Sequence, residues 1–184
     1  MGACMVNLAS GDRIKLLNGE TVTVKSDDVL KKGGQGNLYR SEVNGRDVIL
    51  KWYDCESALK NPELVVETLE SLSKLDMPEL ILPISVTERL GNQYGYVMNY
   101  APEKMVLLSE ALYNRKHIRT KRVRYSIASN VARVISNIHS HGMSFNDLND
   151  NNIFIDPKTG DICLCDCDSI SLKGRRPLVR GQAE

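Results

Sequence analysis

The sequence has no apolar run approaching the roughly 20 residues that a helix needs to cross a bilayer, so we expect no membrane-spanning segment. It also lacks a charge excess, since 24 lysines and arginines oppose 23 aspartates and glutamates. This balance excludes a generally basic nucleic-acid coat protein and an acidic solvating tail. Repeats and low-complexity tracts are absent as well. The 184 residues, 42% of them hydrophobic, suffice for one domain or a tight pair of lobes.

Cysteine is scarce and odd in number, with five residues in all. The first residues lack the charged and apolar regions of a secretory signal, and Val6 stands where an acylated N-terminus would carry Ser or Thr. We therefore expect free thiols in a reducing, cytoplasmic compartment. Cys163, Cys165 and Cys167 alternate with other residues, which would place all three on one face of a strand. Packing as small apolar side chains is favoured over a zinc site, which needs a fourth ligand.

The first hundred residues are predicted to be rich in β-strands. Asn18-Gly19 and Asn44-Gly45 are typical of two-residue hairpin turns, and strand-forming segments flank each of them. Residues 31–36 are predicted to form a flexible turn between two strands, because three of them are glycine. Further strands are expected at Leu80–Val86 and Tyr94–Tyr100.

Two helices are predicted. Asn61, Pro62 and Glu63 suit the first turn of the first helix, and Pro78 is expected to help end it. Its apolar stripe consists of Val65, Leu69, Leu72 and Leu75. The second helix stops near His141 and is lined by Ile127, Val131, Val134, Ile135 and Ile138. A hairpin follows, formed by residues 153–155 and 162–165 around a turn at 156–160.

Two polar features precede the second helix. The turn glycines Gly33, Gly34 and Gly36 would let backbone N–H groups approach phosphate oxygens, and a plain flexible hairpin is the alternative. The turn is not the phosphate loop of nucleoside triphosphatases, because no Gly-Lys-Ser/Thr follows it. Lys51 ends an apolar strand and is either an edge charge that reaches water or a fixed cation for phosphate.

A third polar cluster lies after the second helix. Residues 146–152 and 166–168 are dominated by carboxylate and amide side chains, which suit Mg²⁺, and a solvated polar loop is the alternative. A calcium-binding loop is excluded, because Asn152 replaces the turn glycine and Lys158 replaces the bidentate glutamate.

Taken in order, these features resemble the eukaryotic-type protein kinase family. The glycine-rich loop of the family corresponds to residues 31–39, and its lysine strand corresponds to residues 48–51. The gatekeeper with the hinge corresponds to residues 96–102, the catalytic loop to residues 142–155, and the Asp-Phe-Gly site to residues 166–168. The resemblance implies an α+β, two-lobed kinase-like fold. Residues 1–100 would form a β-rich N-lobe with one helix, and residues 101–184 an abbreviated helical C-lobe.

The resemblance also implies a site for ATP and Mg²⁺. Seven residues would bind ATP, the first four through its phosphates and the rest around its adenine: Gly33, Gly34, Gly36, Lys51, Met98, Asn99 and Ala101. Asp147 would orient the acceptor hydroxyl and accept its proton. Asn152 and Asp166 would hold Mg²⁺.

The chain departs from the family's pattern at several positions. Phe145 and Asn146 replace His and Arg, and Asn149 replaces a lysine of Ser/Thr kinases. Asp168 replaces a glycine, from which we expect a less mobile segment. Glu67 is the candidate partner of the strand lysine, with an exposed helix glutamate as the alternative. Sixteen residues follow Asp168, so the chain is either a minimal kinase or the front part of a longer one.

The expected function is ATP- and Mg²⁺-dependent phosphoryl transfer to a protein Ser/Thr hydroxyl. One alternative is a pseudokinase that binds a nucleotide or a partner, and a second is a small-molecule kinase, which also lacks the lysine at the position of Asn149. The expected partners are ATP and a protein substrate or regulator, with no membrane. The basic residues between 115 and 124 are expected to form a solvated face rather than a nucleic-acid site.

Overall fold

The computed structural model describes residues 7–32, 36–53, 62–114, 118 and 120–172. The chain divides into two compact units, of which the first comprises Met1–Leu75 and Leu82–Tyr100 and the second Asp76–Ile81 and Ala101–Glu184. The short segment 76–81 belongs to the second unit through backbone hydrogen bonds. The Leu164 N–H donates to the Glu79 carbonyl at 2.8 Å, and the Ile81 N–H donates to the Leu164 carbonyl at 2.8 Å.

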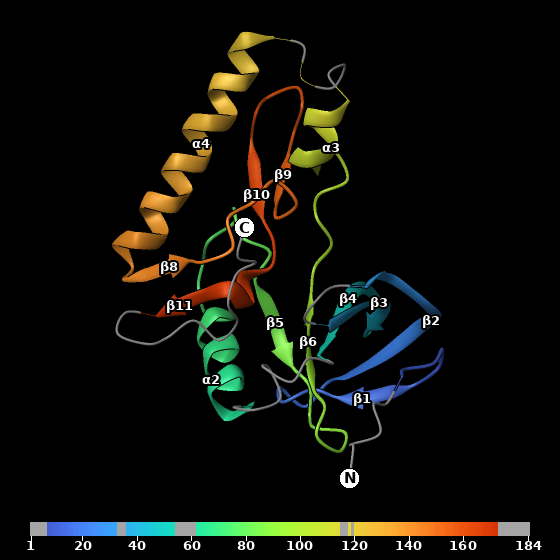
Figure 1. The fold of residues 1–184 in the computed structure, drawn as a ribbon. Coiled ribbons are helices and arrows are strands. Elements are labelled where there is room, and N and C mark those ends of the chain that lie inside the picture. The colour runs from blue at the N-terminus through green and yellow to red at the C-terminus, as the bar shows by residue number, and fades with distance from the viewer. Residues whose placement is uncertain (1–6, 33–35, 54–61, 115–117, 119, 173–184) are drawn as a thin grey trace. The chain divides into compact units, whose positions relative to one another are not determined.

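The first unit contains a six-stranded sheet in the order β1-β2-β3-β4-β6-β5, with every neighbouring pair antiparallel (Figure 1). The strands are β1 (Arg13–Lys15), β2 (Thr21–Lys32), β3 (Gly36–Val43), β4 (Arg46–Tyr53), β5 (Pro83–Val86) and β6 (Gly95–Met98). The two-residue turn at Asn44-Gly45 is confirmed, since Val43 pairs with Arg46 and both turn residues have positive φ, +51° and +78°. A hairpin also forms around Asn18-Gly19, but only Gly19 has positive φ, +87°, and the strand pairing ends at Lys15 and Thr21, so the turn there is longer than the two residues predicted.

Alternation along β4 separates two environments. Val48, Leu50 and Trp52 are buried in a hydrophobic core cluster together with Val97 of β6. Because successive side chains of a strand point to opposite faces, Lys51 lies on the other face of the sheet. The core is therefore built on one side of β4, and the charged residue is presented on the other.

Helix α2 (Pro62–Leu72) also belongs to the first unit and packs against β5. The predicted stripe is buried at Val65, Leu69 and Leu72. The helix ends six residues before Pro78, so the role predicted for this proline was wrong. Serine hydroxyls near its end instead satisfy backbone carbonyls, since Ser71 Oγ donates to the Glu67 carbonyl at 2.8 Å. The predicted cap Asn61 lies outside the described residues.

The second unit combines helices with short strands. Its helices are α3 (Leu108–Tyr113), α4 (Lys121–Ser140) and the 3₁₀ turn η1 (Cys167–Ser169). Its strands are β7 (Val106–Leu107), β8 (Met143–Phe145), β9 (Ile153–Ile155), β10 (Ile162–Leu164) and β11 (Ile170–Leu172). They form a three-stranded sheet, β10-β9-β7, and a two-stranded ribbon, β11-β8. None of the helices described is both long and apolar enough to cross a membrane.

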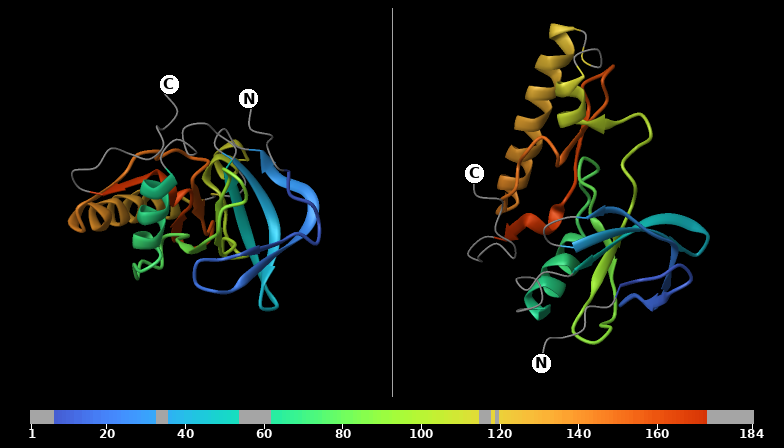
Figure 2. Two further views of the ribbon diagram at one scale, coloured as in Figure 1. Left: turned by 90° about the horizontal axis from the view of Figure 1, so that it is seen from below. Right: turned by 45° about the vertical axis from the view of Figure 1, so that its right-hand side comes forward.

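The long helix α4 and the hairpin β9–β10 were both predicted. Thr120 Oγ1 accepts a hydrogen bond from the Val123 N–H at 3.3 Å and so caps α4, which ends before His141 as expected. The hairpin turn packs against α4 (Figure 2), and a Cβ atom added at Gly160 would lie 2.6 Å from Ser126 Cβ. Asn130 Nδ2 of α4 donates to the Gly160 carbonyl at 2.9 Å.

An ion pair joins α4 to the segment 76–81. Arg133 Nη1 lies 2.8 Å from Glu79 Oε1, and this hydrogen bond holds the pKa of Glu79 below its usual value of 4.5. A lowered carboxylate pKa stabilises the folded state above about pH 4.5, and this contribution is lost as the pH falls through the folded-state value. We expect Arg133→Met to reduce the free energy of unfolding by about 0.5 kcal/mol near neutral pH and by almost nothing near pH 2.5. Urea titrations at both pH values measure this, and equal losses would mean that packing, not charge, is responsible.

Candidate functional site

Lys51 lies in the middle of the first unit's sheet. It pairs with Tyr96 across β4 and β6, and its side chain is buried, with the residue only 4% exposed. Its ammonium nitrogen lies 5.8 Å from the ring centroid of Tyr53 and 6.0 Å from that of Tyr96, within cation–π range. The alternative of an edge charge reaching water is therefore wrong, and Lys51 is a buried lysine.

The rings beside Lys51 form a small aromatic group. The Tyr53 ring lies 5.3 Å from the Tyr94 ring and 6.1 Å from the Tyr96 ring, measured between centroids, and all three tyrosines are almost fully buried. Sequence reasoning missed this group. Tyr53 could have been found because it lies two residues after Lys51 on the same strand face, but Tyr96 required knowledge of the β4–β6 register.

The remaining nucleotide-binding candidates lie at or just beyond strand ends. Gly36 opens β3 opposite Tyr53, and an added Cβ atom would lie 2.3 Å from the Trp52 carbonyl oxygen, so this glycine permits a close approach of two strands. Gly33 and Gly34 lie outside the described residues. Met98 ends β6 and is buried, and the following Asn99 is exposed. Ala101, half-buried, begins the part of the second unit that follows the sheet.

The glutamates of α2 face away from its buried side. Glu63, Glu67 and Glu70 are exposed, whereas Thr68 is buried beside Leu69. The buried position next to Glu67 in the sequence is thus occupied by Thr68. The pairing of Glu67 with the lysine stays a prediction.

In the second unit, Asp147 and Asn152 are in direct contact. Asn152 Nδ2 donates to Asp147 Oδ2 at 2.9 Å and to the Asp147 carbonyl at 2.8 Å. The other carboxylate oxygen, Oδ1, accepts from Asn149 Nδ2 at 3.1 Å. Both oxygens of Asp147 are therefore held by amides, and the carboxylate is fixed in one orientation.

Asn149 has a role that sequence reasoning missed. It was noted only as the replacement of a lysine, yet its amide contacts both the side chain and the carbonyl of Asp147. Its own side-chain oxygen accepts from the Asn151 N–H at 2.9 Å. The spacing Asp-x-Asn, typical of asparagine and aspartate turns, is the signal that could have revealed it.

Asp166 directly follows a backbone contact with this loop. The Cys165 N–H donates to the Asn152 carbonyl at 3.0 Å, and Asp166 itself adopts the left-handed conformation, with φ +62° and ψ +42°. This conformation is uncommon for a residue other than glycine and turns the chain sharply at the end of the hairpin. The second unit therefore places the backbone of Asn152 beside the residue that precedes Asp166, and their shared role as Mg²⁺ ligands stays a prediction.

The oxygen groups of this unit are compatible with Mg²⁺. The amide nitrogen of Asn152 is used by Asp147, so its side-chain oxygen points away from that carboxylate. Within the described part of the chain, no three acidic, histidine or cysteine side chains gather closely enough to hold a metal by themselves. A Mg²⁺ ion here would thus take most of its ligands from phosphates and water, as it commonly does.

The three clustered cysteines do not share a strand face. Strand β10 ends at Leu164, so only Cys163 belongs to it, and the left-handed backbone at Asp166 breaks the alternation before Cys167. The predicted common face was therefore wrong. Cys163 and Cys167 are buried, in agreement with packing as small apolar side chains.

Burial makes these two thiols unreactive. It raises the pKa of Cys163 to about 11, with a smaller contribution from Glu79, and it raises the pKa of Cys167 well above the usual value. A rise from 9.0 to about 11 lowers the thiolate fraction near pH 8 about 100-fold. We expect iodoacetamide to label Cys163 and Cys167 in the folded protein at least 100-fold more slowly than in urea, as measured by peptide mass spectrometry. Labelling at similar rates would contradict their burial.

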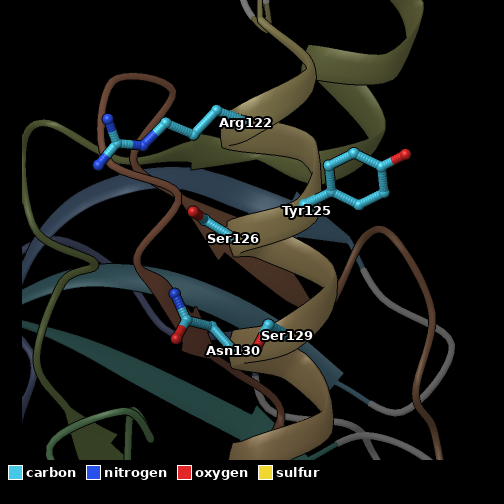
Figure 3. A pocket seen from close by; sticks show the side chains of 5 residues that line it. All are labelled: Arg122, Tyr125, Ser126, Ser129 and Asn130. Atoms are coloured by element: carbon cyan, nitrogen blue, oxygen red, sulfur yellow. The ribbon is translucent and has the colours of Figure 1, made fainter.

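A hollow of about 560 Å³ lies on α4 (Figure 3). Its lining residues are Arg122, Tyr125, Ser126, Ser129 and Asn130. None of them is a predicted site residue. Lys121, Arg122 and Arg124 are exposed here, as expected for a solvated basic face, while Arg115, Lys116 and Arg119 lie outside the described residues.

Comparisons with known proteins agree with this arrangement. A family model described as protein kinase domain matches residues 25–174. No curated protein sequence gives a match.

Among solved structures, vaccinia related kinase 3 is similar over 87% of this chain and 51% of its own, with 18% identity and a TM-score of 0.61. A point mutant of the Mycobacterium tuberculosis PknI kinase domain is similar over 88% and 63%, with 20% identity and a TM-score of 0.64. Rad53 1–466 in complex with AMP-PNP is similar over 79% and 38%, with 21% identity and a TM-score of 0.63. At these identities the likeness shows the fold, and the chain spans between 38% and 63% of the length of these three chains.

Proposed function

We propose a specific reaction for this chain, which belongs to the protein kinase domain family. It transfers the γ-phosphoryl group of ATP to a Ser or Thr hydroxyl of a protein, with Mg²⁺ as cofactor. The observation that carries the proposal is the fixed carboxylate of Asp147. Amide groups of Asn149 and Asn152 hold its two oxygens at 3.1 and 2.9 Å. An oriented carboxylate is what a hydroxyl nucleophile requires from a general base.

The proposed reaction is an in-line displacement at the γ-phosphorus. The acceptor oxygen forms a bond to phosphorus, the bond from phosphorus to the β-γ bridging oxygen breaks, and the hydroxyl proton passes to Asp147. Mg²⁺, held by Asn152 and Asp166, would supply charge neutralisation at the phosphates when bound. Little covalent chemistry is required of the protein, so catalysis depends on how firmly these side chains are positioned.

Lys51 is proposed to hold the α- and β-phosphates of ATP. Burial removes most of its contact with water, and the two tyrosine rings restrict where its ammonium group can lie. A cation in such a setting is less screened than one at the surface, which strengthens its attraction to phosphate oxygens.

A second candidate is a pseudokinase that binds nucleotide and transfers little or no phosphate. The asparagine at position 149, where Ser/Thr kinases have a lysine, favours this alternative. The same asparagine is compatible with a small-molecule acceptor. These alternatives differ from the proposal in what happens to the γ-phosphate.

The test is incubation of the chain with γ-labelled ATP and Mg²⁺, using casein and the chain itself as protein acceptors. Asp147→Asn and Lys51→Ala should both abolish transfer, whereas Asp150→Asn, which changes an exposed aspartate of the same loop, should not. Thermal stabilisation by Mg²⁺-ATP without transfer would support the pseudokinase. An Asp147→Asn variant that kept more than about a tenth of the transfer rate would overturn the proposal.

A further inference from the structure

A two-stranded ribbon connects the loop of Asp147 to the segment that follows Asp166. Strands β8 and β11 pair antiparallel, with Phe145 opposite Ile170 and Met143 opposite Leu172. Three residue pairs make a weak ribbon on their own, since isolated two-stranded structures are marginal in water. Strand β8 also packs against α4, and Met143 and Ile170 are buried, so a contact at the end of the ribbon nearest Asp147 adds to this packing where the chain enters the loop.

Asn146 makes that contact. Its side-chain Nδ2 donates to the Ser169 carbonyl at 2.6 Å, and its backbone N–H donates to the same carbonyl at 3.4 Å. The side chain also lies 3.4 Å from the Ser144 carbonyl. Asn146, the residue before Asp147, is thus hydrogen-bonded to Ser169, the residue before strand β11.

The Ser169 end of this contact leads directly to Asp166. The Ser169 N–H donates to the Asp166 carbonyl at 3.1 Å, closing the turn in which Asp166 is left-handed. Among the described residues, the buried Ser169 Oγ has no hydrogen-bond partner. The hydrogen bonds that join Ser169 to Asn146 and to Asp166 are made by its backbone. The connection from Asn146 to Asp166 therefore consists of hydrogen bonds at the backbone carbonyl and the backbone N–H of one residue, Ser169.

We propose that Asn146 is a positioning residue for phosphoryl transfer, which fixes the segment of Asp166 relative to Asp147. This inference rests on the proposed function, because it concerns the distance between the proposed base and the proposed metal ligand. Asn146 is itself exposed and touches no reacting group, so its effect is exerted through the Ser169 carbonyl. Because the Asn146 amide is uncharged and donates directly to a backbone carbonyl, this hydrogen bond does not require a modified residue, such as a phosphorylated one, in the chain.

The test compares Asn146→Ala and the equally sized Asn146→Asp with two control variants. Asn130→Ala removes an amide that likewise donates to a backbone carbonyl, at 2.9 Å, but in the hairpin turn packed on α4. Ser169→Ala removes only a side-chain hydroxyl and leaves the carbonyl in place. Steady-state kinetics with Mg²⁺-ATP and casein are measured for each variant, together with hydrogen exchange of residues 170–172.

Both Asn146 variants should lower kcat about tenfold and leave KM for ATP within about twofold, and exchange in β11 should become about tenfold faster. Both controls should leave kcat and β11 exchange within about twofold. Asn146 variants that behave like Asn130→Ala would overturn the proposal. If the unmodified chain transferred no phosphate, the proposed function would fail first. The exchange data would then decide separately whether Asn146 holds the ribbon, and unchanged exchange would overturn that part as well.

Discussion

Replacing Asp147 with asparagine should lower kcat for phosphoryl transfer by about 10²- to 10⁴-fold, the usual contribution of a general base. The substitution preserves the shape of the side chain, so the loop keeps its size. It replaces a carboxylate oxygen with an NH₂ group, which cannot accept the hydroxyl proton. That group would also face the amide of Asn149 or Asn152, donor against donor. The measurement is initial-rate kinetics with labelled ATP, accompanied by a thermal melt to establish that the variant is folded.

Asp150→Asn is the matched control, since it makes the same chemical change three residues further along the loop. The Asp150 side chain is exposed, and its Oδ1 accepts a hydrogen bond from Asn151 Nδ2 at 3.4 Å. It should retain kcat within about twofold. If Asp147→Asn kept more than a tenth of the activity, Asp147 would not be the base.

Gly95→Ala should destabilise the first unit by about 3 kcal/mol. Gly95 lies opposite Trp52 in the β4–β6 pair, and an added Cβ atom would lie 2.2 Å from the Lys51 carbonyl oxygen. Backbone atoms of a central strand cannot yield as the end of a flexible side chain can. The strands must therefore separate, which weakens their hydrogen bonds and moves Lys51. Urea titration followed by tryptophan fluorescence measures the loss, because Trp52 is the single tryptophan.

Gly19→Ala separates this clash from the general effect of replacing glycine. No atom lies within 4 Å of an added Cβ at Gly19, but its φ of +87° makes the residue unfavourable for alanine by about 1–2 kcal/mol. Gly95 has no such positive φ, so without the clash alanine there would be neutral or stabilising. A smaller loss for Gly95→Ala than for Gly19→Ala would contradict the close approach of β4 and β6.

Features determined by neighbouring residues could be predicted from the sequence. The Asn44-Gly45 turn requires positive φ at fixed positions. Helix α4 is 20 residues long and its buried apolar residues extend from Val123 to Ile138, so its helical period is clear. Asp147 and Asn152 are five residues apart in one loop, so their contact was also within reach of sequence reasoning.

Features determined by residues far apart in the sequence could not be predicted. Strands β8 and β11 are three residues each and pair across more than 20 residues of chain, so neither has a readable period. For the same reason β7, with two residues, was missed. The alternation of the cysteines predicted a strand through all three of them. The left-handed backbone at Asp166 breaks this alternation, and the spacing of side chains in a sequence does not reveal the sign of φ.

The two faces of β4 have a consequence for the fidelity of folding. Moving this strand by one position along its neighbours would send the ammonium of Lys51 into the apolar cluster and bring Leu50 and Trp52 out of it. An unpaired charge in such surroundings carries a penalty that no hydrogen bond of the ladder could offset. The apolar residues of β4 thus favour the alignment that places the lysine proposed to hold the nucleotide, because they are buried in the core only in that register.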